Sequence, residues 1–164
     1  MTIPTNLALA GNNNENGQIA PGLHRQVIQS VGATRTLKER ESGALCLFDS
    51  AAGVVYTLPA SATIGTTFEF RTTVTITSNA AKTITGAATE FILGAIFGYT
   101  TDATEIDGFS GDGSTHIAVS SNGSTTGGVI GDCYTLTKIS ATQWSIEGSV
   151  FCGTSTPATP FATS

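Results

Sequence analysis

The sequence is poor in charge, and in positive charge above all. Asp, Glu, Lys and Arg make up 12% of its 164 residues, about half of the ~25% usual in globular proteins. Seven basic residues stand against twelve acidic ones, and in residues 83–164 the only basic residue is Lys138. Because nucleic-acid binding needs clustered Lys and Arg for the phosphates, we expect no nucleic-acid partner. No apolar run approaches the ~20 residues that span a bilayer, so we expect no membrane partner either.

The sequence also lacks the residue patterns of an enzyme or a metal centre. Its histidines, His24 and His116, have no metal-ligand spacing, and no nucleophile elbow or phosphate-binding loop is present. Carboxylates do gather in one Gly-rich segment, at Asp102, Glu105, Asp107 and Asp112. Their spacing is not that of an EF-hand, so they fit a solvated loop, with a Ca²⁺ site or a polysaccharide hydrolase as alternatives. We expect a non-enzymatic protein with no catalytic residues, cofactor or metal.

Cysteines are few, and their spacing includes no paired motif such as C-x-x-C. Cys46, Cys133 and Cys152 are far apart, and an odd number cannot pair fully within one chain. Reduced thiols in strands are favoured over a disulfide or a metal site. The first residues also lack the cationic and long apolar regions of a signal peptide, so we expect synthesis in a cytoplasm.

What the sequence does have is Thr, 19 glycines and many short segments that alternate between apolar and polar residues. This alternation is typical of strands with one buried face. It predicts strands at 67–71, 74–77, 83–85, 133–139 and 143–148, and short apolar stretches predict further strands at 45–48, 54–58 and 116–120. Residues 23–31 fit a helix or a strand, and the glycines of 98–128 predict long loops around one strand. We therefore expect an all-β fold, a compact antiparallel β-sandwich or barrel-like domain over residues 21–152.

The last two predicted strands form the clearest hairpin. They flank the short turn 140–142, and alternation places Tyr134, Leu136, Trp144 and Ile146 on one apolar face. We expect this face to lie in the core.

Both ends of the chain are predicted to extend from the domain. Residues 1–20 are predicted to form an extended arm, and residues 153–164 a flexible tail with two prolines. The arm combines two apolar anchors with an Asn-rich spacer, so we expect it to order on a partner through Leu7, Leu9, Asn12, Asn13 and Asn14.

Several segments resemble small structural proteins of tailed-bacteriophage virions, most closely the head decoration (cement) proteins. They are GALCLFD at 43–49, YTLPA at 56–60 and IGTTFEF at 64–70, with GDCYTL at 131–136 and WSIEG at 144–148. The resemblance implies a homotrimer on the capsid surface of the virion, with the major capsid protein lattice as partner. The alternative is a tail-fibre or spike domain that binds glycans, for which Tyr99, Phe109 and Trp144 would have to form an exposed platform.

Overall fold

A computed structural model describes residues 25–29, 34–77, 81–102, 104–153 and 156–164. In these ranges the chain forms strands and no α-helix, and one turn of 3₁₀ helix at Glu39–Glu41. The strands are β1 (Val27–Gln29), β2 (Arg35–Thr36), β3 (Leu45–Phe48), β4 (Val55–Thr57), β5 (Thr67–Thr72), β6 (Ala81–Ile84), β7 (Phe91–Thr100), β8 (Ile106–Asp112), β9 (Ala118–Ser121), β10 (Cys133–Lys138), β11 (Gln143–Cys152) and β12 (Phe161–Ala162).

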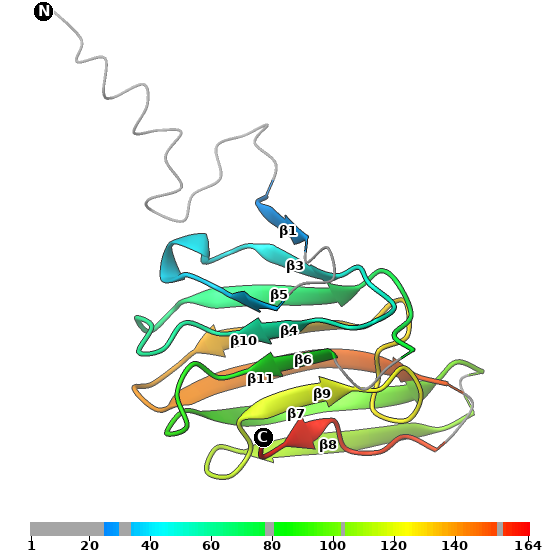
Figure 1. The fold of residues 1–164 in the computed structure, drawn as a ribbon. Helices are drawn as coiled ribbons and strands as arrows, with labels where there is room; N and C mark the ends of the chain where they lie inside the picture. The colour runs from blue at the N-terminus through cyan, green and yellow to red at the C-terminus, as the bar shows by residue number, and fades with distance from the viewer. Residues whose placement is uncertain (1–24, 30–33, 78–80, 103, 154–155) are drawn as a thin grey trace, which may run out of the picture.

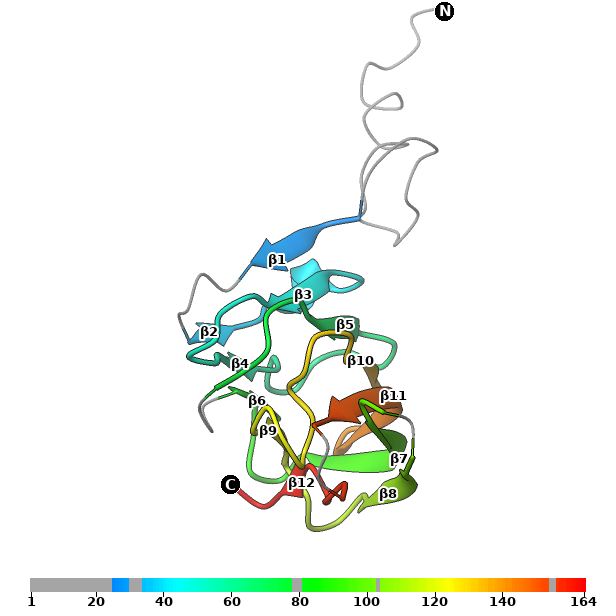
Figure 2. The ribbon, with the colours of Figure 1, turned by 90° about the vertical axis from the view of Figure 1, so that its right-hand side faces the viewer.

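The strands form two sheets that pack face to face. The seven-stranded sheet has the order β1-β3-β5-β10-β11-β7-β8, and the five-stranded sheet has the order β12-β9-β6-β4-β2. Figure 2 shows the two sheets as separate layers. The predicted all-β sandwich is thereby confirmed.

The first six strands coil between the two sheets, which makes the sheets mixed instead of wholly antiparallel. Odd-numbered strands β1, β3 and β5 join one sheet, even-numbered β2, β4 and β6 join the other, and all neighbours among them run parallel. Val27 is paired with Leu45 and Leu45 with Glu69, so successive turns of the coil differ in length. The sequence does not predict the parallel direction, because alternation within a strand is the same whichever way the strand runs. It shows no repeat either, because turns of unequal length leave no fixed period.

The second half of the chain adds two hairpins to the seven-stranded sheet and the strands β9 and β12 to the five-stranded sheet (Figure 1). β7 and β8 are antiparallel partners at the far edge, and the β10–β11 hairpin lies between β5 and β7. This is the hairpin that the sequence predicts. Its four expected core side chains, Tyr134, Leu136, Trp144 and Ile146, are all buried.

The core between the sheets is rich in aromatic rings. Phe70 stacks on Tyr134 with ring centroids 5.2 Å apart, and Phe48 and Tyr56 meet edge to face at 5.3 Å. The Tyr134 hydroxyl is 2.8 Å from Thr83 Oγ1, which joins β10 of one sheet to β6 of the other. Burying rings with satisfied hydroxyls is the main source of stability for such a sandwich.

Three local predictions differ from the structure. Residues 74–77 are not a strand, because the Ile76 and Thr77 amides bond to Gly128 and Ala51 in loops instead of to a ladder. The segment 98–112 lies largely in strands β7 and β8 instead of loops. Its glycines allow neighbouring backbone segments to come close together. A Cβ at Gly111, for example, would lie 2.6 Å from the Ile92 carbonyl oxygen.

The third difference is at the C-terminus. The flexible tail expected over 153–164 contains β12, which pairs with β9 at the edge of the five-stranded sheet. Phe161 is 6% exposed, and the Pro160 carbonyl accepts a hydrogen bond from the Ser120 amide at 2.8 Å. Proline excludes only central strands, so prolines that lead into an edge strand are compatible with this packing. At the other end, Val27–Gln29 is strand, the option that β-branched Val27 and Ile28 favour.

Candidate interaction surface

The outer face of the seven-stranded sheet is the face of the larger of the two described sheets that points away from the core. Strand register sets its rows, because side chains on paired residues point to the same side. Its centre carries short hydroxyl side chains from β5, β10 and β11, namely Thr67, Thr135, Thr137, Ser145 and Ser149. Thr67 and Thr137 join across their strands with hydroxyl oxygens 2.9 Å apart. Short side chains lose little rotamer freedom when they are covered, so such a centre suits contact with another protein.

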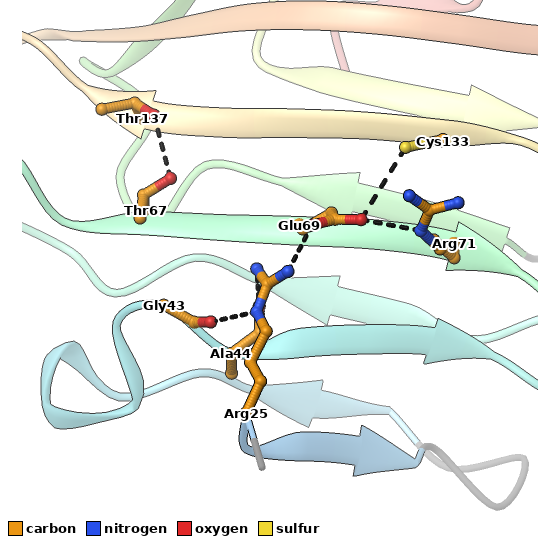
Figure 3. Close-up of polar contacts among 8 residues, drawn as sticks. All are labelled: Arg25, Gly43, Ala44, Thr67, Glu69, Arg71, Cys133 and Thr137. Carbon is orange, nitrogen blue, oxygen red and sulfur yellow. Dashed lines mark hydrogen bonds and ion pairs between the residues drawn. The ribbon is translucent and has the colours of Figure 1, made fainter. Parts of the chain in front are cut away.

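An ion-pair cluster lies beside this centre (Figure 3). Arg25 leads into β1 and pairs with Glu69 on β5, while Arg71 Nε lies 2.7 Å from the other carboxylate oxygen of Glu69. Arg25 also donates to the Gly43 carbonyl and, at 3.2 Å, to the Ala44 carbonyl. Glu69 thus holds two arginines in place on the surface.

Electrostatics in the cluster follow from this geometry. Hydrogen bonding to Arg25 is the largest influence on Glu69 and holds the pKa of its carboxyl below the usual value, against the smaller effect of burial. Burial raises the pKa of the neighbouring Cys133 thiol, so it is not an activated nucleophile. With two cations and one anion, the cluster leaves this part of the sheet positive.

Apolar side chains cover the other end of the same face. The apolar patch consists of Leu93, Ala95, Phe97, Tyr99, Ile106 and Phe151, which point outward from β7, β8 and β11. Phe97 is 51% exposed and Ile106 60%, while the rings of Tyr99 and Phe151 lie 6.0 Å apart. Exposed apolar side chains that gather in one place mark interaction sites.

The apolar patch has an acidic rim on the same face, formed by two exposed carboxylates: Asp112 is the register partner of Leu93, and Glu147 is the register partner of Ala95. Strands β7, β8 and β11 contain no Lys or Arg. Of the four carboxylates that the sequence gathers, Asp112 belongs to this rim, whereas Asp107 pairs with Gly98 and lies on the other side of the sheet. Asp112 closes the turn after β8 by accepting from the Ser114 and Thr115 amides, while Asp102 bonds to Thr104 before β8 begins. The two carboxylates therefore lie at opposite ends of a seven-residue strand.

A smaller apolar strip lies at the opposite end of the face, beside the ion-pair cluster. It consists of Val27 on β1 and Leu45 and Leu47 on β3. Val27 is 51% exposed and the two leucines are half-buried. Arg71 is the register neighbour of Leu47, so positive charge borders this apolar strip as negative charge borders the patch.

The structure does not describe the predicted arm, and it does not bring the three aromatic residues of the alternative platform together. Leu7, Leu9, Asn12, Asn13 and Asn14 of the predicted arm lie outside the described residues. Trp144 is fully buried and Phe109 points toward the core, so Tyr99, Phe109 and Trp144 do not form a surface platform. The three cysteines are free and lie in strands, as expected.

The sequence reading missed the apolar patch. The run FILGAIFGY at 91–99 could have indicated the patch. It places apolar residues on both faces of a strand, a pattern typical of strands that are buried on both sides. The loops predicted for residues 98–128 begin inside this run, at Gly98, and residues 91–97 received no strand prediction.

Two buried polar groups have structural partners. Glu90 lies 2.7 Å from Lys138 Nζ and accepts hydrogen bonds from Trp144 Nε1 at 2.9 Å and the Ser61 amide at 2.9 Å. Burial alone would raise the pKa of Glu90, but these partners together lower it. Asp132 accepts from the Gly128 and Phe151 amides and fixes the loop before β10. Both side chains are buried, and their partners hold neighbouring segments of the fold together.

Within the described ranges, no three His, Cys, Asp or Glu side chains come close enough to hold a metal ion. No helix in the described part of the chain has the length and apolar character needed to cross a membrane. Comparison with family models, curated proteins and solved structures finds no match to this chain.

Proposed function

We propose that this chain is a non-enzymatic capsid decoration protein of a tailed bacteriophage, which binds and stabilises the assembled capsid lattice as a trimer. The observation that carries the proposal is the outer face of the seven-stranded sheet, where short hydroxyl side chains lie between an exposed apolar patch and an apolar strip. Such a face suits permanent contact with protein subunits. The resemblance of residues 35–150 to virion structural proteins is the reason for proposing a capsid as the assembly that the chain joins.

The predicted arm has a separate part in this proposal. It would extend from the domain onto a capsid subunit and bury Leu7 and Leu9 there. Full burial of a Leu side chain is worth roughly 1.5–3 kcal/mol, so loss of both would weaken attachment by about two to four decades before ordering entropy is subtracted.

Co-sedimentation tests both parts. Purified protein is mixed with capsids assembled without it and pelleted, and wild-type protein is compared with a variant that lacks residues 1–17. We expect saturable binding of the wild type, sharply weaker binding of the deletion variant, and the same thermal transition for both isolated proteins. Absence of wild-type binding would contradict the decoration role, and equal binding of the deletion variant would contradict the role of the arm.

The runner-up function is glycan binding by a tail-fibre or spike domain. One observation favours it: the adjacent outward rings of Tyr99 and Phe151, with exposed Phe97 beside them, provide aromatic surface of the kind that sugars stack on. A glycan array decides between the two roles. Specific glycan retention that is lost in Tyr99→Ala, together with no capsid binding, would favour the fibre role.

A further inference from the structure

We propose that the chain binds a second copy of itself through the outer face of the seven-stranded sheet, with the apolar patch of one copy packed on the apolar strip of the next. This inference deepens the proposed function, whose trimer needs such a contact. Its test uses purified protein without capsids, so that the two proposals can fail separately.

The two apolar surfaces need a partner because water covers them in the single chain. The patch exposes Leu93 at 36%, Phe97 at 51% and Ile106 at 60%, and the strip exposes Val27 at 51%. These are four of the eight large hydrophobic side chains that the described residues expose, and all four lie on one face of one sheet. A concentration of this kind on a single face indicates a protein contact more strongly than scattered exposed side chains do.

Charge selects the pairing of patch with strip. Acidic groups rim the patch, and Glu147 is the register neighbour of Ala95 in it. Arg25 and Arg71 border the strip, with Arg71 half exposed to solvent. Packing patch on patch would bring carboxylates together without any basic residue from β7, β8 or β11, whereas packing patch on strip brings Glu147 toward Arg71. Such complementarity fixes orientation and suppresses the alternative contact.

The same pairing cannot form within one chain. β3, which carries most of the strip, and β7, which carries most of the patch, are separated by three strands in the same sheet. At ~4.8 Å between strands they lie about 19 Å apart, and both point to the same side. The strip that a given patch contacts must therefore belong to another molecule. Because every copy carries both halves, the contact closes as a two-fold pair or repeats around a ring such as a trimer.

Sedimentation equilibrium of four variants tests the proposal. Phe97→Ser removes an apolar anchor, Glu147→Arg reverses the rim, and the double variant Glu147→Arg/Arg71→Glu exchanges the two charges. Ile64→Ser is the matched control, because Ile64 is 65% exposed but lies outside the sheet. We expect the wild type to self-associate and the first two variants to dissociate at least about tenfold more readily. The double variant should recover association, and the control should behave as the wild type.

Either of two results would overturn the proposal. One is a wild-type protein that stays monomeric up to about 100 µM, a concentration well above the dissociation constants of stable, specific interfaces. The other is a wild-type oligomer whose dissociation neither Phe97→Ser nor Glu147→Arg changes. Glu147 is exposed, so Glu147→Arg keeps the test valid even if Phe97→Ser destabilises the fold, which a thermal melt of each variant reports.

Discussion

Trp144 takes part in several core interactions. Its ring is fully buried, lies 6.4 Å from Phe68, has Lys138 Nζ 5.2 Å from its centroid and donates a hydrogen bond to Glu90. We predict that Trp144→Ala lowers the free energy of unfolding by ~3–5 kcal/mol, as for other large buried aromatics. Urea denaturation measures it, with Ile64→Ala as a control expected to cost under ~0.5 kcal/mol. A loss below ~1 kcal/mol for Trp144→Ala would contradict the assigned packing.

Asp132 should make the free energy of unfolding fall as pH rises through the weakly acidic range. Burial raises its pKa to about 7, although the Phe151 and Gly128 amides act in the opposite direction. The folded state therefore keeps a proton that the unfolded state releases near its ordinary pKa of about 4. Between these values the free energy of unfolding should fall as pH rises, by at most about 1.4 kcal/mol per pH unit, and the contribution is constant above them.

Denaturation of wild type and Asp132→Asn at pH 5, 6, 7 and 8 checks this. Asp132→Asn should lower stability, because one amide loses its acceptor, and should flatten the slope between pH 5 and 7. An unchanged slope would show that Asp132 is ionised throughout.

Single-residue roles could be predicted from the sequence only where they follow from alternation. Tyr134 and Trp144 were placed in the core because each lies on the apolar side of a strand. The Glu90–Lys138 ion pair could not be foreseen, since its partners lie on segments far apart in the chain and a charged residue gives no sign of being buried.

At the scale of elements, close contact between neighbouring strands depends on glycine. Gly148 in β11 has φ +147°, and a Cβ there would lie 2.3 Å from the Cys133 carbonyl oxygen of β10. Gly43 also has positive φ, +86°, but a Cβ there meets nothing within 4 Å. Alanine at Gly43 therefore brings backbone strain alone, and alanine at Gly148 adds a clash with backbone.

We predict that Gly43→Ala costs about 1 kcal/mol of stability and Gly148→Ala about 3 kcal/mol or more. Thermal melts of the two variants measure the difference. Equal losses would mean that β10 and β11 separate easily, contrary to the described pairing.

Strand positions were largely predictable, and their partners were not. Alternation located β5, β10 and β11 because each buries one face, and a short apolar run located β3. It failed for β7, which is apolar on both sides and contains two glycines, and for β12, which is too short for a pattern. Pairing and direction depend on how the chain crosses between the sheets, so the parallel coil of the first six strands has no local signal.

For the whole molecule, the charge asymmetry of the sequence becomes an asymmetry of one surface. The acidic second half supplies β7, β8 and β11 and hence the acidic rim, while Arg25 and Arg71 come from the first half. Composition indicated the uneven charge. Only the strand order places the two signs at opposite ends of one sheet, where they can direct assembly.

The central claim, that the chain decorates a capsid, is tested most directly by an electron-microscopic difference map. Virions that carry the protein are compared with virions assembled without it, at a resolution that separates capsid from tail. We predict added density on the outer surface of the capsid, in groups of three at local three-fold positions. Added density confined to the tail, or no difference between the two particles, would contradict the account.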